Sequence, residues 1–161
     1  MEIVDMSVTE QCMTSDTVNI IRSKISSLAD CMIDNIKSGN MQEQDCPVTH
    51  RFSSGCYLRE IFMPKGTVIV GKIHATEHFN VILTGDVTVV TAEWTKRFKA
   101  PHTFISGAGV QKVVYIHEDC QWQTLHVTNK KDIEEIEKDV IVKDYDQLET
   151  DYLLNKCKGL L

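Results

Sequence analysis

The stretch GTVIVGKIHATEHFNVILTG, residues 66–85, decides the fold expected for this chain. It begins and ends with glycine and carries Lys72, His74 and His78 between runs of β-branched residues. Such residues favour strands, and side chains two positions apart on a strand lie on the same face. We therefore expect Lys72 and His74 to point together, and His78 to share a face with Asn80.

The same strand-type pattern extends outward through the centre of the chain, residues 56–127. Turn residues separate eight short runs, at 56–63, 67–70, 79–83, 87–91, 97–99, 103–105, 112–117 and 121–127. No helical periodicity interrupts these runs, so an antiparallel arrangement fits them better than a βαβ arrangement. The pattern predicts a mainly β fold, a double-sheet jelly-roll barrel of antiparallel strands.

An amphipathic helix is predicted before the barrel. Ser15 or Asp16 can cap it, and its apolar residues recur every three or four positions until residues 37–39 end it. Such a stripe must be buried, either on the barrel or against another subunit. Residues 40–54 are polar and without periodicity, which predicts a linker. The N-terminal helix and linker then span residues 1–54.

The barrel itself is predicted to span residues 55–128, and a helical tail to span 129–161. Asp132 and Glu135 form a capping signal for one short helix, and a second short helix is expected from Tyr145 onward.

The spacing of the decisive stretch resembles the first motif of the cupin superfamily, G-x5-H-x-H-x(3,4)-E-x6-G. Lys72 stands where the family has its first His, His74 matches the second, and His78 stands in place of the Glu. The second motif is fainter, and Lys112 stands where the family has its last metal ligand. The resemblance implies an RmlC-like jelly roll, whose relatives hold a divalent metal with these side chains. The sequence around these motifs also resembles that of small uncharacterised cupin-like proteins of tailed bacteriophages. This resemblance implies a phage-encoded protein.

Strand alternation adds two residues to the pocket that this resemblance implies. Gln121 and Gln123 belong in water, so Trp122 and His126 on the same strand should face inward. The predicted ligand-binding residues are Lys72, His74, His78, Lys112, Trp122 and His126. Tyr57 and Arg59 lie on another strand that can line the pocket, but the face they occupy is ambiguous.

Two lysines at ligand positions favour an anion over a metal ion. A protonated lysine donates hydrogen bonds and has no lone pair for a metal. We therefore predict a small anionic ligand, such as a nucleotide or a sugar phosphate. The cofactor stays unknown, with a divalent transition metal favoured less than none.

Other functions stay open, and the sequence does not decide whether the protein is an enzyme. A cupin enzyme can use a metal held by His74, His78 and His126. It can also work without metal, as an acid–base isomerase or hydrolase. A third alternative is a structural assembly module.

Composition limits the partners. The net charge is -6, with 23 acidic and 17 basic residues, whereas proteins that coat nucleic acids or membrane surfaces need an excess of basic residues. No stretch has the length and hydrophobicity of a membrane span, and the six cysteines form no Cys-x-x-Cys pair. We expect a cytoplasmic protein, in the host cytoplasm if viral. It should bind neither nucleic-acid polymer nor membrane, and form a homodimer or higher homo-oligomer.

Overall fold

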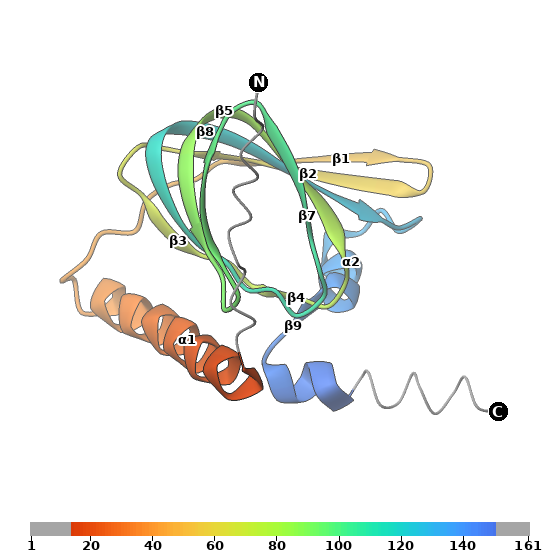
Figure 1. Ribbon diagram of the computed structural model, residues 1–161. Coiled ribbons are helices and arrows are strands. Elements are labelled where there is room, and N and C mark those ends of the chain that lie inside the picture. The colour runs from red at the N-terminus through yellow and green to blue at the C-terminus, as the bar shows by residue number, and fades with distance from the viewer. Residues whose placement is uncertain (1–13, 151–161) are drawn as a thin grey trace, which may run out of the picture.

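The computed structural model describes residues 14–150 of the chain. Its helices are α1 (Ser15–Lys37) and α2 (Ile133–Val140). Its strands are β1 (Val48–Ser53), β2 (Cys56–Met63), β3 (Val68–Val70), β4 (Ile73–His74), β5 (His78–Val90), β6 (Thr95–Lys99), β7 (His102–Ser106), β8 (Val113–Val127) and β9 (Ile141–Val142). The strands curve into a barrel, with α1 below β3 and α2 at the opposite side of the view (Figure 1).

Two long strands, β5 and β8, are shared by both sheets of the barrel. They pair antiparallel with each other along most of their length. On one side of the bend β2 and β7 extend the sheet, with β1 beyond β2, and on the other side β3 and β6 do so. All pairings are antiparallel, which confirms the predicted mainly β, double-sheet jelly-roll barrel.

Each long strand was expected as two separate strands, and this part of the prediction is wrong. Gly85 lies within β5 at φ +98°, among three register shifts between β5 and β8. The shifts bend the strand without ending its pairing, because a bulge changes direction and keeps the ladder. Gly85 is needed there, since a Cβ would lie 2.7 Å from the carbonyl oxygen of Asp119.

The core fills the space between the two sheets. Its buried members come from β2, β5 and β8: Met63, Ile82, Val87, Val89, Val114, Ile116, Cys120 and Trp122. A second, smaller cluster joins Tyr57 of β2 to Ile136 and Val140 of α2. The helix α2 is therefore packed onto the barrel by its apolar face.

The predicted N-terminal helix is confirmed. Its cap is Thr14 and not Ser15 or Asp16 as expected. Thr14 accepts a hydrogen bond from the backbone of Thr17, and the helix ends at Lys37. Only Ile25 of its apolar stripe is buried, against the barrel side that carries β3. The predicted linker at 40–54 is wrong in its second half, because Val48–Ser53 forms β1. Six of its residues pair with β2, and this edge strand is mostly exposed, so hydrophobic alternation could not reveal it.

The short helix near the C-terminus is also confirmed. Asp132 caps α2 by accepting a hydrogen bond from the backbone of Glu135, as expected. The chain then returns to the barrel as β9, which pairs with β4 and was not predicted. A further helical segment begins at Tyr145, and its expected continuation beyond residue 150 lies outside the described residues.

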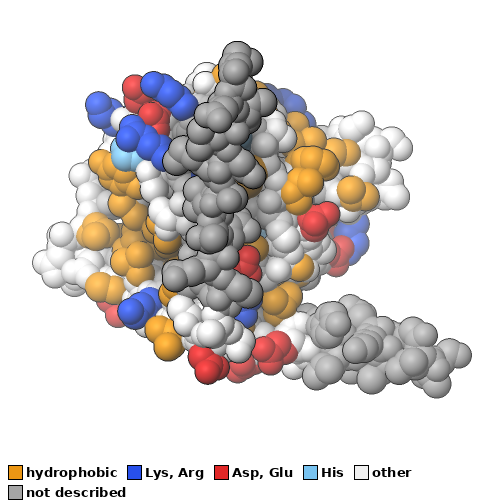
Figure 2. Space-filling model, in the orientation of Figure 1, with side chains coloured by type: hydrophobic (Ala, Val, Ile, Leu, Met, Phe, Trp, Pro, Cys, Tyr) orange, Lys and Arg blue, Asp and Glu red, His pale blue; other side chains and the backbone are white. Residues whose placement is uncertain are grey.

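Charges are mixed on the surface. On the face shown in Figure 2, basic side chains lie next to acidic ones instead of forming one continuous basic area. Neither helix, α1 nor α2, combines the length and the hydrophobicity that crossing a bilayer requires.

Candidate functional site

Three histidines from three strands meet inside the barrel, at the end that α2 covers. His74 lies on β4, His78 begins β5, and His126 lies near the end of β8. Their ring centroids are 4.0 Å apart for His74 and His78, 4.8 Å for His78 and His126, and 5.3 Å for His74 and His126. His78 and His126 are buried, and His74 is half-buried. The structure thus brings His126 next to two histidines that lie about 50 residues earlier in the sequence.

Lys112 lies against this cluster. It immediately precedes β8, the residue is 8% exposed, and its Nζ is 3.3 Å from Nε2 of His78. The other ring nitrogen of His78, Nδ1, is 3.1 Å from the carbonyl oxygen of Thr76. Because a carbonyl only accepts, Nδ1 must carry the proton, and Nε2 then offers its lone pair to the Lys112 ammonium.

Burial keeps the three imidazoles neutral. Desolvation, helped by nearby positive charge, lowers the pKa of His74 to about 2 and the pKa values of His78 and His126 to about 4. Desolvation also lowers the pKa of Lys112 to about 8, so in most protein molecules the Lys112 side chain is charged at pH 7. The cluster therefore holds one positive charge beside three neutral rings.

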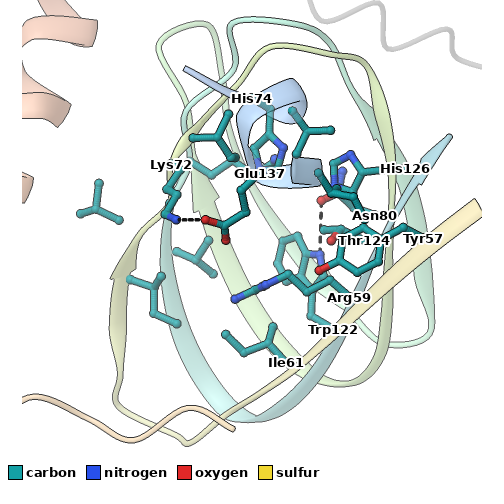
Figure 3. Close-up of a pocket in the computed structure, with 18 of the residues that line it drawn as sticks. Tyr57, Arg59, Ile61, Lys72, His74, Asn80, Trp122, Thr124, His126 and Glu137 are labelled. Carbon is teal, nitrogen blue, oxygen red and sulfur yellow. Dashed lines mark hydrogen bonds and ion pairs between the residues drawn. The ribbon is translucent and has the colours of Figure 1, made fainter. Parts of the chain in front are cut away.

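Lys72 lies at the rim and not beside the imidazoles. Its side chain is 61% exposed, and its Nζ is 3.0 Å from Oε2 of Glu137 on α2 (Figure 3). The expectation that Lys72 and His74 share one face of a strand does not hold, because Gly71 and Lys72 precede β4 and form no strand. Hydrogen bonds from the backbone of Gly71 to Lys112 and from Gln111 to Gly71 hold this segment.

Trp122 faces the interior, as predicted. Its Nε1 donates to Oδ1 of Asn80 at 3.3 Å, and Nδ2 of Asn80 donates to the Ser106 hydroxyl at 3.0 Å. This buried network satisfies the indole N–H and fixes Trp122 as part of the wall.

The pairing of β2 settles which of its residues face inward. Tyr57 lies opposite His126, and Arg59 lies opposite Thr124. Tyr57 is buried, and its hydroxyl is 2.7 Å from Nδ1 of His50. Arg59 is half-buried, and within residues 14–150 no carboxylate lies within 4.0 Å of it. The sequence pointed to this strand but not to its face.

A cavity of about 310 Å³ lies among these elements, and His78, although beside Lys112, is not one of its lining residues. It is lined by Tyr57, Arg59, Ile61, Met63, Ile69, Val70, Gly71, Lys72, His74, Asn80, Lys112, Val114, Trp122, Thr124, His126, Ile136, Glu137, Val140 and Ile141. Figure 3 shows Glu137 and Arg59 reaching toward its middle. Sequence reasoning missed Glu137, because nothing local to α2 indicates that the helix covers the barrel end.

Some buried polar atoms of this site have no partner within the described part of the chain. These are Nδ1 of His74, Nδ1 of His126 and Oε1 of Gln111. A buried polar atom without a hydrogen bond is costly and needs an explanation, such as a bound water or ligand.

Imidazoles are suitable ligands for a divalent metal, but the spacing of these three and the charge beside them are not suitable. Their candidate ligand nitrogens lie within 4.8 Å of one another, whereas zinc bonds of about 2.1 Å place tetrahedral ligands about 3.4 Å apart. The three rings would therefore have to move slightly closer together to bind a zinc ion. The greater obstacle is Lys112, whose ammonium occupies the lone pair of His78. A dication about 4 Å from that charge would be opposed by about 8 kcal/mol at an effective dielectric of 20. A metal ion therefore does not fit while Lys112 is protonated and in place.

Solved cupin structures resemble this barrel. A cupin domain from Schizosaccharomyces pombe is 21% identical with a TM-score of 0.46, over 60% of this chain and 72% of that chain. An RmlC-like cupin from Methanocaldococcus jannaschii is 10% identical with a TM-score of 0.46, over 55% of this chain and 84% of that chain. An acetylacetone dioxygenase from Acinetobacter johnsonii is 14% identical with a TM-score of 0.46, over 53% of this chain and 61% of that chain.

The chain has a cupin-like fold. That statement rests on the strand pairing, with its two shared strands and antiparallel double sheet. No family model matches the sequence, and no curated protein matches it. The phage origin expected from the sequence stays a prediction.

Proposed function

We propose that this cupin-like barrel binds a small anionic molecule in its cavity, with Lys112 and Arg59 holding the negative charge. The observation that carries the proposal is the buried ammonium of Lys112. It lies in the cavity wall, and its side-chain partner within residues 14–150 is the neutral ring of His78. A buried charge without a counter-charge is unfavourable, so an anion in the cavity would stabilise it.

The other charges of the cavity support the same conclusion. Three cationic side chains, Arg59, Lys72 and Lys112, line it together with one carboxylate, that of Glu137. This excess of positive charge occurs in a protein whose net charge is -6. Because Glu137 already neutralises Lys72 at the rim, the charges of Arg59 and Lys112 are left for a ligand.

Calorimetric titration tests the proposal with three anionic probes, namely hexanoate, benzoate and inorganic phosphate, at low salt. At least one should bind the wild type, and Lys112→Met should weaken that binding at least about tenfold, as expected for loss of a charge-assisted hydrogen bond. Lys96→Met is the matched control, because Lys96 is exposed over Trp94 and outside the cavity. Absence of binding by all three probes, or equal binding by Lys112→Met, would refute the proposal.

A metal-dependent enzyme is the second candidate, favoured by the histidine cluster itself. His74, His78 and His126 would hold the ion, which would supply Lewis acidity to a bound substrate. This function requires Lys112 to lose its proton or turn away. Elemental analysis of protein purified without chelators separates the two candidates: about one equivalent of transition metal per chain supports the enzyme, and less than about a tenth supports the anion-binding protein.

A further inference from the structure

Along four of the strand segments that surround the cavity, the inward-facing side chains change from polar to apolar. In order from the α2 end toward the bend of β5 and β8, the inward-facing residues on β2 are Tyr57, Arg59, Ile61 and Met63, and on the second half of β8 they are His126, Thr124, Trp122 and Cys120. In the same order, on β5 they are His78, Asn80 and Ile82, and at the start of β8 they are Lys112, Val114 and Ile116. Four strand segments thus place charged or polar groups at one end and hydrophobic groups at the other.

The apolar end, which we call the floor, consists of Ile61, Met63, Ile69, Val114 and Trp122. It offers no free hydrogen-bonding side chain, since the indole N–H of Trp122 is already bonded to Asn80. From the level of Arg59 to that of Met63 the strand rises about 13 Å, at about 3.3 Å per residue. A ligand held at Arg59 and Lys112 therefore extends its other end into a hydrophobic space.

We propose that the ligand is a compact monoanion with an apolar body, such as a medium-chain or bicyclic monocarboxylate. This inference rests on the proposed anion-binding function and names its ligand class. The carboxylate lies between Lys112 and Arg59, and the apolar body lies against the floor.

The size and polarity of the cavity argue against the larger and more polar anions. Its volume of about 310 Å³ lies at the lower end of the range of about 300–1,000 Å³ that is typical of small-molecule pockets. A compact ligand suits that volume, whereas the ribose hydroxyls and the polar base of a nucleoside monophosphate would lack hydrogen-bond partners at the floor. A sugar phosphate is small enough, but its hydroxyls would lose their hydrogen bonds to water against the floor.

Titration of the full chain with a homologous series tests the inference. The probes are acetate, hexanoate, octanoate and 2-naphthoate, with AMP, glucose 6-phosphate and octanol for comparison. Affinity should rise about threefold to fourfold for each methylene that enters the floor and then level off. Octanoate should bind more tightly than AMP, glucose 6-phosphate and octanol.

The outcomes separate this inference from the function on which it rests. Tighter binding of AMP or glucose 6-phosphate than of octanoate, or an affinity independent of chain length, would overturn the ligand class and leave anion binding standing. If no anion binds, the proposed function itself fails. If octanol binds as tightly as octanoate, the cavity is an apolar site without charge recognition, and both proposals are wrong.

Variants of the floor test where the apolar body lies. Ile69 is half-buried and faces the cavity, while its neighbour Val68 is exposed. Ile69→Phe should weaken octanoate binding at least about tenfold, equivalent to loss of about two buried methylenes, and leave acetate unchanged. Val68→Phe should change neither. Ile69→Ala, which tests the same wall should the Phe variant not fold, should shift the best chain length upward by one or two carbons. Equal octanoate affinity in both Ile69 variants and the wild type would contradict the proposal.

Discussion

The Nζ of Lys112 lies 3.3 Å from Nε2 of His78, inside the barrel and 34 residues away in sequence. The contact places an ammonium group where a metal ion bound to His78 would need the same lone pair. Because the Thr76 carbonyl fixes the proton of His78 on Nδ1, the ring has no second lone pair to offer. The charge at the centre of this site therefore comes from a side chain of the protein itself.

Replacing that ammonium with a metal ligand should create a metal site. In Lys112→His, a fourth imidazole would stand beside His74, His78 and His126, and the repulsive charge would be absent. We expect this variant to retain about one equivalent of zinc or nickel after dialysis, measured by elemental analysis.

Lys112→Met serves as the comparison for this prediction. It removes the charge without adding a ligand, so it should bind metal more weakly than Lys112→His and more tightly than the wild type. Wild-type protein that binds zinc as tightly as Lys112→His would show that Lys112 does not oppose a metal.

Acid should destabilise the fold through the buried imidazoles. Their pKa values are lowered to about 2 for His74 and about 4 for His78 and His126, against 6.5 in the unfolded chain. As pH falls below 6.5, the unfolded state binds protons that the folded state does not, so stability is lost. Each imidazole should contribute about 1.4 kcal/mol per pH unit between pH 6.5 and its folded pKa.

Urea unfolding at pH 7.5, 6.0 and 5.0 measures this effect. In His126→Gln the free energy of unfolding should fall less steeply with pH, because one of the three buried imidazoles is missing. His102→Gln changes a half-buried histidine outside the cavity lining and should have the same pH dependence as the wild type. A free energy of unfolding that is constant from pH 7.5 to 5.0 would be inconsistent with neutral buried rings.

Removing the carboxylate at the rim should strengthen anion binding. Glu137 lines the cavity and is half-exposed beside Lys72. Because exposed ion pairs are worth about 0.2 to 1 kcal/mol, Glu137→Gln should raise the affinity for octanoate or benzoate about twofold to fivefold at low salt. The gain should shrink as salt is added.

Glu134→Gln is the matched control, since Glu134 lies on the same helix but does not line the cavity. It should leave the affinity within experimental error of the wild type. If the two variants behave alike, the effect belongs to the net charge of the protein and not to the rim of the cavity.

The bend of the barrel should depend on Gly85. This residue has φ +98°, and a Cβ would lie 2.7 Å from the Asp119 carbonyl oxygen and 2.8 Å from Cα of Cys120. We expect Gly85→Ala to lower the free energy of unfolding by more than about 3 kcal/mol, because backbone atoms must move apart.

Gly66 provides a control with similar backbone geometry. It has φ +84°, and a Cβ would meet no atom within 4 Å. Gly66→Ala should therefore cost only about 1 to 2 kcal/mol, the strain of the left-handed conformation. Equal losses in the two variants, measured by urea unfolding, would show that the close approach at Gly85 is unimportant.

Local patterns in the sequence predicted most elements of the fold. Asp132 predicted the start of α2 correctly because the bond it makes is local, and apolar periodicity predicted α1, although its cap is Thr14 and not Ser15 or Asp16. Strand alternation placed Trp122 and His126 in the interior correctly, and the spacing of residues 66–85 pointed to a barrel. Alternation failed at Lys72, because it applies only within a strand and β4 begins one residue later.

The content of the site was decided by tertiary structure. Whether Arg59 faces the cavity depends on how β2 pairs with β8, and the approach of Lys112 to His78 depends on the curvature of the barrel. The position of Glu137 depends on α2 packing over the barrel end through Ile136 and Val140. Sequence periodicity records which side chains share a face of one element, whereas the distance between charges on different elements is set only when those elements pack together.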